Sequence, residues 1–190
     1  MDTLDFYDAN AKEYAAESLT HDVLEDRGRF ISKLKKGARI LDLGCGSGRD
    51  SFTFSRLGYE AVPVDGSENM CREAERYTGL PVRCLTFSEL DYEEEFDGVW
   101  ACASLLHVPS GELPQVLSLV RRALRKNGVF FCCFKKGDFE GMRDGRRYTD
   151  MTSERLGNLL KECGFSDVEL WENTAAETGV RWVNAISRKE

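Results

Sequence analysis

Two aspartates and three glycines near one predicted strand carry the most informative chemistry of this 190-residue chain. The segment ILDLGCGSGRDS, residues 40–51, runs from an apolar strand into a loop that contains Gly44, Gly46 and Gly48. Asp42 precedes this loop, and Asp65 ends the next predicted strand about twenty residues further on. A glycine-rich turn after a strand lets the backbone approach a ligand closely. The segment therefore predicts a cofactor site.

Three kinds of cofactor compete for such a loop. A P-loop ends in Gly-Lys-Ser/Thr, whereas Gly48 is followed by Arg49 and Asp50. A dinucleotide loop reads G-x-G-x-x-G, but here the third glycine comes one residue early. The carboxylate of Asp42 would repel a pyrophosphate at the helix N-terminus and attract a cation instead. S-adenosylmethionine carries an ammonium, a sulfonium and no phosphate, so Asp42 favours that cofactor. Asp65 can accept the ribose hydroxyls of its adenosyl group.

Several segments together resemble the class I S-adenosylmethionine-dependent methyltransferases. The first two are ILDLGCGSGRDS and VPVDGSENM, which follows it along the chain. FDGVWACASLLHV is similar to the fourth strand of that family, ALRKNGVFFCCF to its fifth-strand motif, and FYDANAKEYA to the N-terminal cap helix of small-molecule members. LLHVP and the RDGR loop resemble small bacterial members that are loosely related to tellurite-resistance methyltransferases.

The resemblance implies a binding surface for the methionine moiety. Gly44, Cys45 and Gly46 are expected to line it by their backbone, with Asp42 near the ammonium group. Ala101, just after the fourth strand, is expected to offer its carbonyl to the same ammonium. The alternative is that the glycines only make a strand-to-helix turn.

The resemblance also implies an adenosine site. Asp65 is expected to bind the ribose, Gly66 and Met70 to flank the adenine, and Phe87 to offer its backbone to the adenine edge. Thr86 stands where the family often has an aspartate, so its side-chain contact to the adenine amine is open. The alternative for Asp65 is a helix N-cap.

Two interpretations remain for the residues nearest the reacting atoms. His107 is either a general base for a hydroxyl or amine acceptor, or a packed loop residue. Tyr7 and Tyr14 lie seven residues apart, a spacing that places both on one face of a helix. They either close over the cofactor or only pack as part of the apolar stripe of that helix. The family likeness favours Tyr14 as part of a lid. Trp182 is either a core residue or a wall of the acceptor pocket.

The segment from Lys135 to Met151 follows a predicted strand at its carboxyl end, so it should border the site. Its candidate binding residues for an anionic acceptor are Lys136, Arg143, Arg147 and Tyr148. Acidic residues in the same segment nearly cancel the basic ones, so a solvated loop of mixed charge is the alternative. Arg121, Arg122, Arg125 and Lys126 are expected to close the preceding helix.

Composition excludes several classes of protein. The chain has 26 basic and 33 acidic residues, a net charge of −7, which argues against a broad nucleic-acid footprint. Seven cysteines without a C-x-x-C pair, and two distant histidines, predict no metal site. No apolar run is long enough for a membrane span, and the acidic start MDTLDFYDAN predicts no signal peptide, so a cytoplasmic protein is expected.

The elements that must position these residues alternate between strand and helix. Predicted helices cover residues 3–18, 22–34, 49–57, 67–77, 110–128 and 152–163. Predicted strands cover residues 38–43, 59–65, 82–87, 96–106, 129–134, 168–173 and 181–189. Continuous apolar strands that alternate with helices indicate a mostly parallel sheet covered on both faces, here a seven-stranded α/β sandwich. The last two strands should form an antiparallel hairpin at its edge.

We therefore expect one Rossmann-like domain over residues 1–190, with residues 1–35 as cap helices and residues 36–190 as the core. The expected function is methyl transfer from S-adenosylmethionine to a small-molecule acceptor, with S-adenosylhomocysteine as product. Two alternatives stay open, namely a methyltransferase acting on RNA or protein, and a protein that binds S-adenosylmethionine without turnover. The sequence ACAS, in place of an N-P-P-Y-like motif after the fourth strand, counts against the first.

Overall fold

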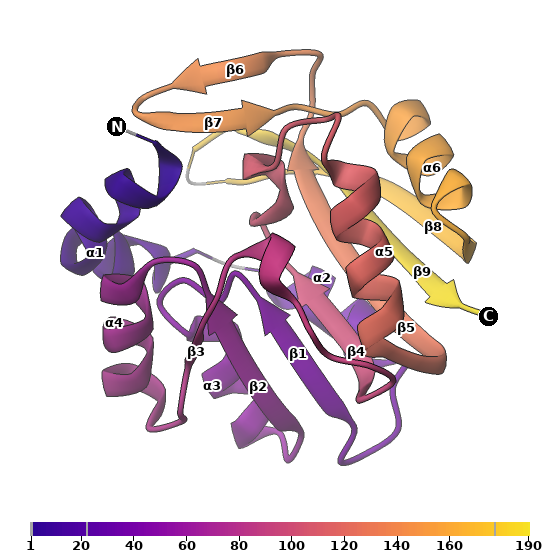
Figure 1. Ribbon diagram of the computed structural model, residues 1–190, viewed down its shortest axis with the longest axis horizontal. Coiled ribbons are helices and arrows are strands. Elements are labelled where there is room, and N and C mark those ends of the chain that lie inside the picture. Colours follow the sequence, from indigo (N-terminus) through magenta and orange to yellow (C-terminus); the bar gives the residue numbers. More distant parts are fainter. Residues whose placement is uncertain (1, 22, 177) are drawn as a thin grey trace.

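The computed structural model describes residues 2–21, 23–176 and 178–190 and shows a three-layer α/β sandwich (Figure 1). Its central seven-stranded sheet has the order β3-β2-β1-β4-β5-β9-β8. The strands from β3 to β5 pair in parallel, and β9 pairs antiparallel with both β5 and β8. The predicted mostly parallel sheet with a C-terminal hairpin is confirmed.

The helices are α1 (Thr3–Ser18), α2 (Leu24–Ile31), α3 (Arg49–Arg56), α4 (Glu68–Thr78), α5 (Leu113–Ala123) and α6 (Ser153–Glu162). The strands of the large sheet are β1 (Arg39–Leu43), β2 (Glu60–Asp65), β3 (Arg83–Cys84), β4 (Phe96–Ala101), β5 (Leu124–Lys135), β8 (Phe165–Thr174) and β9 (Arg181–Lys189). Asp22, the expected first residue of the second helix, lies outside the described residues.

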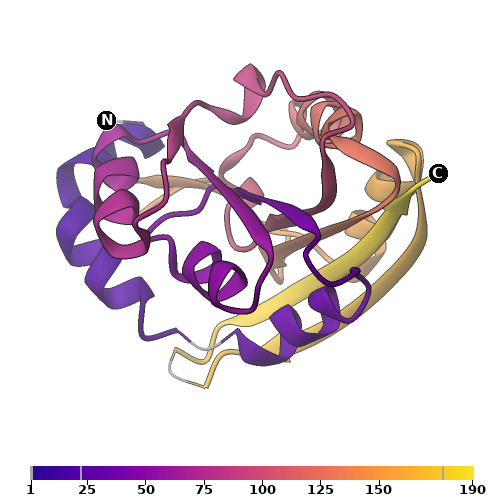
Figure 2. The same ribbon diagram turned by 90° about the horizontal axis from the view of Figure 1, so that it is seen from below.

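Helices cover both faces of the sheet (Figure 2), and a hydrophobic cluster lies on each side of it. Phe30 of α2 and Phe54 of α3 are fully buried against one face, and Leu117 of α5 and Leu160 of α6 pack on the other. Gly98 makes room for α2, because a Cβ atom there would lie 2.7 Å from Cζ of Phe30. A glycine inside a strand thus marks a close approach between layers.

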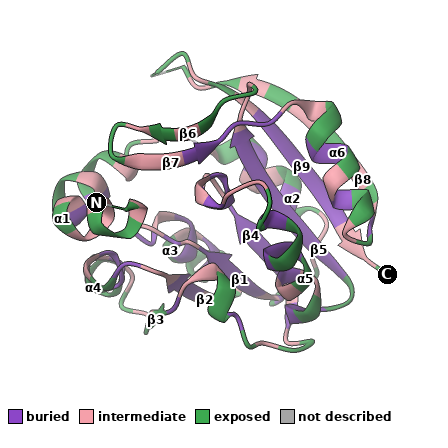
Figure 3. Cartoon of the chain, turned by 45° about the horizontal axis from the view of Figure 1, so that its top comes forward, coloured by how far each residue is buried: buried purple, intermediate pink, exposed green. Residues whose placement is uncertain are grey.

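Burial follows position in the sheet (Figure 3). The central strands β1 and β4 are almost wholly buried, whereas the edge strand β8 alternates between exposed and partly buried residues. The alternation fits an edge strand with one solvated face. No helix within residues 2–21, 23–176 and 178–190 is both long and apolar enough to span a membrane.

Two predicted strands are shorter than expected. The strand predicted for residues 82–87 contains only Arg83–Cys84, because Thr86 and Glu89 form a capping box that starts a 3₁₀ turn. The strand predicted for residues 96–106 ends at Ala101, because Ala103 adopts a positive φ of 52°. The apolar residues beyond it stay buried in a second 3₁₀ turn, Leu105–His107, and therefore looked like more strand.

The helix predicted for residues 110–128 was wrong at both ends. It begins at Leu113 without a Ser110 cap, because the Ser110 hydroxyl donates to Glu140 at 2.6 Å. It ends at Ala123, because the buried Leu124 pairs with Phe96 of β4. Tertiary pairing at the sheet therefore overrides the local helix propensity of this segment. The basic residues after Ala123 consequently belong to β5 and not to the helix.

The segment after β5 was predicted as a loop but contains a second sheet. Strands β6 (Glu140–Arg143) and β7 (Arg146–Thr149) form an antiparallel hairpin around Asp144 and Gly145. Both turn residues have positive φ, 52° and 77°. An Asp-Gly pair is the typical sequence of such a tight turn. The hairpin lies next to the N-terminal end of α1 (Figure 1).

Candidate active site

A cavity of about 1290 Å³ lies at the carboxyl ends of β1, β2, β4 and β5. In open α/β sheets this is the edge where ligands bind. Pockets for one small ligand typically measure about 300–1,000 Å³, so this cavity has room for a cofactor and an acceptor. Cap helix α1, the hairpin β6–β7 and the end of β8 also border it.

The glycine loop forms one wall of the cavity through its backbone. The N–H groups of Gly44 and Cys45 both donate to the Val64 carbonyl at 2.9 Å, which fixes the loop against β2. Gly44 has φ +74°, and a Cβ atom there would lie 2.5 Å from Cβ of Ser104. Both the backbone conformation and the space therefore require glycine. Gly44, Cys45 and Gly46 all line the cavity, as expected.

Asp65 ends β2 with its carboxylate held by backbone. It accepts the N–H of Gly46 and the N–H of Ser67, each at 2.9 Å. The N-cap of α4 is Ser67, whose hydroxyl accepts the Met70 N–H at 3.1 Å. Burial raises the pKa of Asp65 above its ordinary range. Each carboxylate oxygen has two lone pairs, so Asp65 keeps capacity for ligand hydroxyls on the cavity side.

Asp42 is a buried carboxylate on the cavity wall. It is 3% exposed and accepts the Ser51 hydroxyl at 2.6 Å. Burial and the neighbouring Asp50 raise the pKa of Asp42 to about 7. A carboxylate in this state is ready to pair with a cation, because a buried charge is costly until it is compensated. This supports the ammonium contact expected from the sequence.

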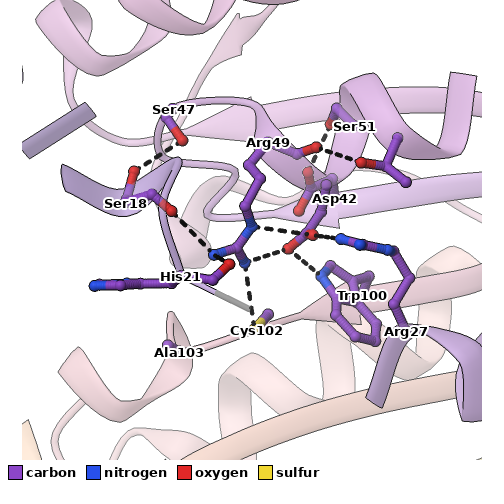
Figure 4. A network of polar contacts seen from close by, with 12 residues as sticks. Ser18, His21, Arg27, Asp42, Ser47, Arg49, Ser51, Trp100, Cys102 and Ala103 are labelled. Atoms are coloured by element: carbon purple, nitrogen blue, oxygen red, sulfur yellow. Dashed lines mark hydrogen bonds and ion pairs between the residues drawn. The ribbon is translucent and has the colours of Figure 1, made fainter. Parts of the chain in front are cut away.

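A buried polar network lies behind the glycine loop, where Arg27, Arg49 and Trp100 point toward one another (Figure 4), and Asp50 is the acceptor that they share. Its carboxylate accepts from Arg27 of α2 at 2.6 Å, from Arg49 at 2.8 Å and from Nε1 of Trp100 at 3.0 Å. The guanidinium groups hold the pKa of Asp50 below its ordinary range against the cost of burial. The network joins α2, α3 and β4 beside the cavity.

The same network holds the N-terminal segment in place. Arg49 donates to the backbone carbonyls of Ser18 at 3.1 Å and of His21 at 3.3 Å, as Figure 4 shows. The Ser18 hydroxyl donates to Ser47 of the glycine loop at 2.8 Å. The end of α1 is therefore fastened directly to the loop that lines the cavity.

The predicted adenine side is formed by four residues that line the cavity, Gly66, Met70, Thr86 and Phe87. Leu4 of α1 lies over Gly66, where a Cβ atom would be 3.0 Å from its Cδ2. The Thr86 hydroxyl donates to Glu89 at 2.7 Å, so it is committed to the turn that it caps. The Thr86 oxygen keeps lone pairs that can accept from the adenine amine, so this contact stays a prediction.

The expectation for Ala101 was wrong. Ala101 is fully buried inside β4, and the cavity wall is formed instead by Cys102, Ala103 and Ser104. Ala101 is the last residue of β4 and not the first residue after it, so the first residue beyond the strand, Cys102, is the first that lines the cavity.

His107 is held between α1 and β7. Its Nδ1 lies 2.6 Å from the Arg147 carbonyl, and its Nε2 lies 2.8 Å from the Tyr7 hydroxyl. A carbonyl only accepts, so Nδ1 carries the proton and the Tyr7 hydroxyl donates to Nε2. Burial, with Arg146 and Lys135 adding to it, lowers the pKa of His107 to about 4. The imidazole is therefore neutral, both of its nitrogens are hydrogen-bonded, and His107 lines the cavity.

Lys135 and Arg146 form a cationic patch at the same end of the cavity, and the sequence analysis missed both. Nζ of Lys135 lies 4.0 Å from the centroid of the Tyr148 ring, and the Arg146 guanidinium lies 5.5 Å from the same ring. Among the residues that the structure describes, neither forms an ion pair with a carboxylate. Burial and the charges of Arg143 and Arg146 lower the pKa of Lys135.

Two of the predicted anion-binding residues point elsewhere. Lys136 pairs with Glu172 at 2.5 Å and Arg143 pairs with Asp150 at 3.0 Å, and neither lines the cavity. Successive residues of a strand face opposite sides, so Lys135 rather than Lys136 reaches the cavity. The other predicted acceptor-side residues, Arg147, Tyr148 and Trp182, do line the cavity, and so does Tyr14, the predicted lid residue. Across the described parts of the chain, no three His, Cys, Asp or Glu side chains are placed to hold a metal ion.

Comparison with known proteins agrees with this geometry. Residues 40–128 match the family model described as "Methyltransferase domain". The ubiquinone biosynthesis O-methyltransferase of Rhodopseudomonas palustris is 31% identical over 98 residues, 49% of this chain and 38% of that protein. The probable S-adenosyl-L-methionine-dependent methyltransferase TehB of Haemophilus influenzae is 41% identical over 135 residues, 66% of this chain. The chain spans less than half the length of both relatives, 38% and 46%.

Solved structures share the fold. The 1,6-didemethyltoxoflavin-N1-methyltransferase of Burkholderia thailandensis, solved with S-adenosylhomocysteine, has a TM-score of 0.83 at 23% identity and covers 98% of this chain and 86% of its own. Phosphoethanolamine N-methyltransferase 2 of Haemonchus contortus has a TM-score of 0.77 at 18% identity, over 97% of this chain and 59% of its own. The strand order and glycine loop thus define a Rossmann-like class I methyltransferase fold. Residues 40–128 are thus similar to a methyltransferase domain, and the chain shares the fold of methyltransferases solved with S-adenosylhomocysteine.

Proposed function

We propose that this protein transfers a methyl group from S-adenosylmethionine to a small anionic acceptor and releases S-adenosylhomocysteine. The observation that carries the proposal is one continuous cavity with two unlike ends. Carboxylates and loop backbone line one end, and Tyr7, His107, Lys135 and Arg146 line the other. We also propose that residues 1–190 act as a single domain, with residues 1–35 as its cap.

The residues at the first end fit the cofactor. Asp42 offers a buried carboxylate to an ammonium group, and Asp65 offers carboxylate oxygens to ribose hydroxyls. Two acidic side chains beside the loop disfavour a pyrophosphate. When bound, S-adenosylmethionine supplies a methyl group already activated by its sulfonium. The protein then has to align the acceptor with that methyl group and exclude water.

The residues at the second end fit an acceptor that carries an anion and a proton. Lys135 and Arg146 lack a carboxylate partner in the part of the chain that the structure describes, and an anionic acceptor would supply one. Tyr7 and Tyr14 of α1 enclose this end, which supports a small acceptor over RNA or protein. The net charge of −7 supports the same choice.

The Tyr7–His107 pair can remove a proton from the acceptor. The Tyr7 hydroxyl takes the acceptor proton while it passes its own to Nε2 of His107. The Arg147 carbonyl, hydrogen-bonded to Nδ1, then stabilises the imidazolium. Burial lowers the pKa of His107, and the charges of Arg146 and Lys135 lower it further. An anion bound between these cations counters that effect, so acceptor binding makes His107 a stronger base.

Turnover with a panel of small hydroxy and amino acids or phosphates, read as S-adenosylhomocysteine released, tests the proposal. For an acceptor that must lose a proton, Tyr7→Phe should lower kcat roughly 100-fold. The matched control is Tyr77→Phe, because Tyr77 is 41% exposed and lies outside the cavity. Binding of S-adenosylmethionine without turnover of any acceptor would favour a binding-only protein. Equal rates for the two variants would remove Tyr7 from the mechanism.

A further inference from the structure

Two cysteines lie side by side in the wall of the cavity. Cys102 directly follows β4 and Cys133 lies in β5, one residue beyond the registered pair Ala101 and Cys132. Their sulfur atoms are 4.0 Å apart, and both residues line the cavity. Neighbouring strands are about 4.8 Å apart, within the 4.4–6.8 Å Cα separation that a disulfide needs. Side-chain rotation alone can therefore join these two sulfurs.

A chain of donors converges on the Cys102 sulfur. The Ala103 N–H donates to Sγ of Cys133 at 3.0 Å, and the Cys133 thiol donates to Sγ of Cys102 at 4.0 Å. The Arg49 guanidinium donates to the same Cys102 sulfur, also at 4.0 Å. Cys102 is partly exposed toward the cavity, whereas Cys133 is buried. The Arg49 guanidinium favours negative charge on Cys102, and Cys102 is the more exposed of the two cysteines, so a peroxide reaches its sulfur first.

We propose that Cys102 and Cys133 are a redox-active pair that hydroperoxides oxidise to a disulfide, and that this disulfide weakens ligand binding in the cavity. The Cys102 thiolate attacks the O–O bond of hydrogen peroxide, forming a sulfenic acid and, with the thiol proton, one water molecule. The Cys133 sulfur then attacks the sulfur of the Cys102 sulfenic acid and displaces hydroxide. The hydroxide takes up the proton of the Cys133 thiol and leaves as the second water molecule. Two thiols and one peroxide thus give one disulfide and two waters.

At neutral pH the two cysteines are expected to stay in the thiol form unless peroxide is supplied for a long time. The Cys133 thiol and burial raise the pKa of Cys102 well above its usual value, while the charge of Arg49 opposes this shift. Reaction with peroxide is therefore expected to be slow at neutral pH and to accelerate as pH rises, because the thiolate is the nucleophile. The pair responds to sustained oxidant rather than to a brief exposure.

The disulfide would change the cavity at the cofactor end. Cys102 would leave the Arg49 guanidinium, which also holds the Ser18 and His21 carbonyls of the N-terminal segment. Cys133 would leave the Ala103 N–H, and Ala103 itself lines the cavity. We expect the oxidised protein to bind S-adenosylhomocysteine at least fivefold more weakly. This consequence rests on the proposed function, whereas the disulfide itself does not.

Peptide mapping after peroxide treatment tests the pair directly. The wild type should lose two thiols, gain a Cys102–Cys133 crosslink and recover both thiols with dithiothreitol. Cys133→Ser should give no crosslink at Cys102, and Cys102→Ser serves the same purpose if the first variant does not fold. Cys163→Ser, a partly exposed cysteine outside the cavity, is the matched control and should still form the crosslink. A crosslink between other cysteines only, such as Cys71 and Cys84, overturns the proposal.

Calorimetry with S-adenosylhomocysteine on the reduced and oxidised wild type completes the test. Weaker binding after oxidation that dithiothreitol reverses, and that is absent in Cys133→Ser, is the expected result. A mapped crosslink with unchanged affinity overturns the regulatory part. Reduced protein that does not bind the ligand contradicts the proposed function instead, so the two failures are distinguishable.

Discussion

At the scale of single residues, the most informative feature of the cavity is its charged side chains that have no partner of opposite charge within the described ranges of the chain. Asp42 and Asp65 place acidic groups at one end, and Lys135 and Arg146 place basic groups at the other. Each group is partly or fully buried, so its protonation state responds strongly to a charged ligand. The ligand chemistry can therefore be tested through pKa values as well as through affinity.

Asp42 should link cofactor binding to pH. Below its pKa of about 7 the carboxyl is protonated in the ligand-free protein, and pairing with an ammonium group releases that proton. The affinity for S-adenosylhomocysteine should therefore rise with pH, by at most about tenfold per unit, and level off above pH 7. Calorimetry in buffers of different ionisation enthalpy measures the released proton. Asp42→Asn should bind more weakly and lose this dependence; an unchanged pH profile in that variant would exclude the ammonium contact.

Arg146 should control the pKa of His107. The groups that face this imidazole are Tyr7, Tyr148, Lys135, Arg146 and the backbone of Arg147. Removing one cation in Arg146→Met should raise the pKa of His107 by about one unit. NMR titration can follow it, because the chain has only two histidines. Arg147→Met, which loses an equal charge but keeps the carbonyl on Nδ1, should shift it less. Equal shifts would show that His107 responds to net charge alone.

Residue types could be predicted from the sequence where one local motif defines them. The glycine loop, Asp42 and Asp65 were expected at the site and line the cavity. Lys135 was missed because its neighbour Lys136 has the same charge, and the sequence does not reveal which of the two lines the cavity. Arg146 was missed although it lines the cavity together with the predicted Arg147. Cys102 likewise replaces Ala101 because the end of β4 depends on a backbone turn at Ala103.

At the scale of elements, close contacts between layers fix the helices that cover the site. Gly98 of β4 lies against Phe30 of α2, and α2 carries Arg27 of the polar network. Gly98→Ala should lower the free energy of unfolding by about 1–3 kcal/mol, because the new methyl group clashes with a fully buried ring. Gly28→Ala in α2, where a Cβ meets nothing within 4 Å, should raise it by up to about 1 kcal/mol.

Urea denaturation of the two alanine variants checks this pair. Phe30→Leu in the Gly98→Ala background should recover part of the loss, because it relieves the same contact. Equal effects of Gly98→Ala and Gly28→Ala would contradict the close packing of α2 on the sheet.

Element boundaries were less predictable than element order. The alternation of strands and helices was correct from residue 38 to residue 134, and α6 and the terminal hairpin were also found. The long predicted helix up to Gly128 failed because Leu124 pairs with β4, which no local pattern reveals. Asp144–Gly145 is a typical turn sequence that indicates the hairpin β6–β7. The hairpin was missed because the mixed charge of this segment suggested a solvated loop.

At the scale of the whole molecule, topology brings the two ends of the cavity together. The chain runs outward from β1 to β3 and returns to β4 on the other side of β1, so the site lies at the point where strand order reverses. Helix α1 closes this point from the N-terminal side, and β6–β7 closes it after β5 (Figure 1). The acceptor end is thus built from segments far apart in sequence, which explains why motif reasoning located the cofactor end better.

Isothermal titration with S-adenosylmethionine and S-adenosylhomocysteine, on the wild type and Asp65→Ala, tests the central claim most directly. Asp91→Ala is the matched control, because Asp91 is an exposed carboxylate paired with Arg83. We predict micromolar binding of both ligands, weakened at least tenfold, or about 1.4 kcal/mol, by Asp65→Ala and unchanged by Asp91→Ala. Folded wild-type protein that binds neither ligand would contradict the methyltransferase assignment of this cavity.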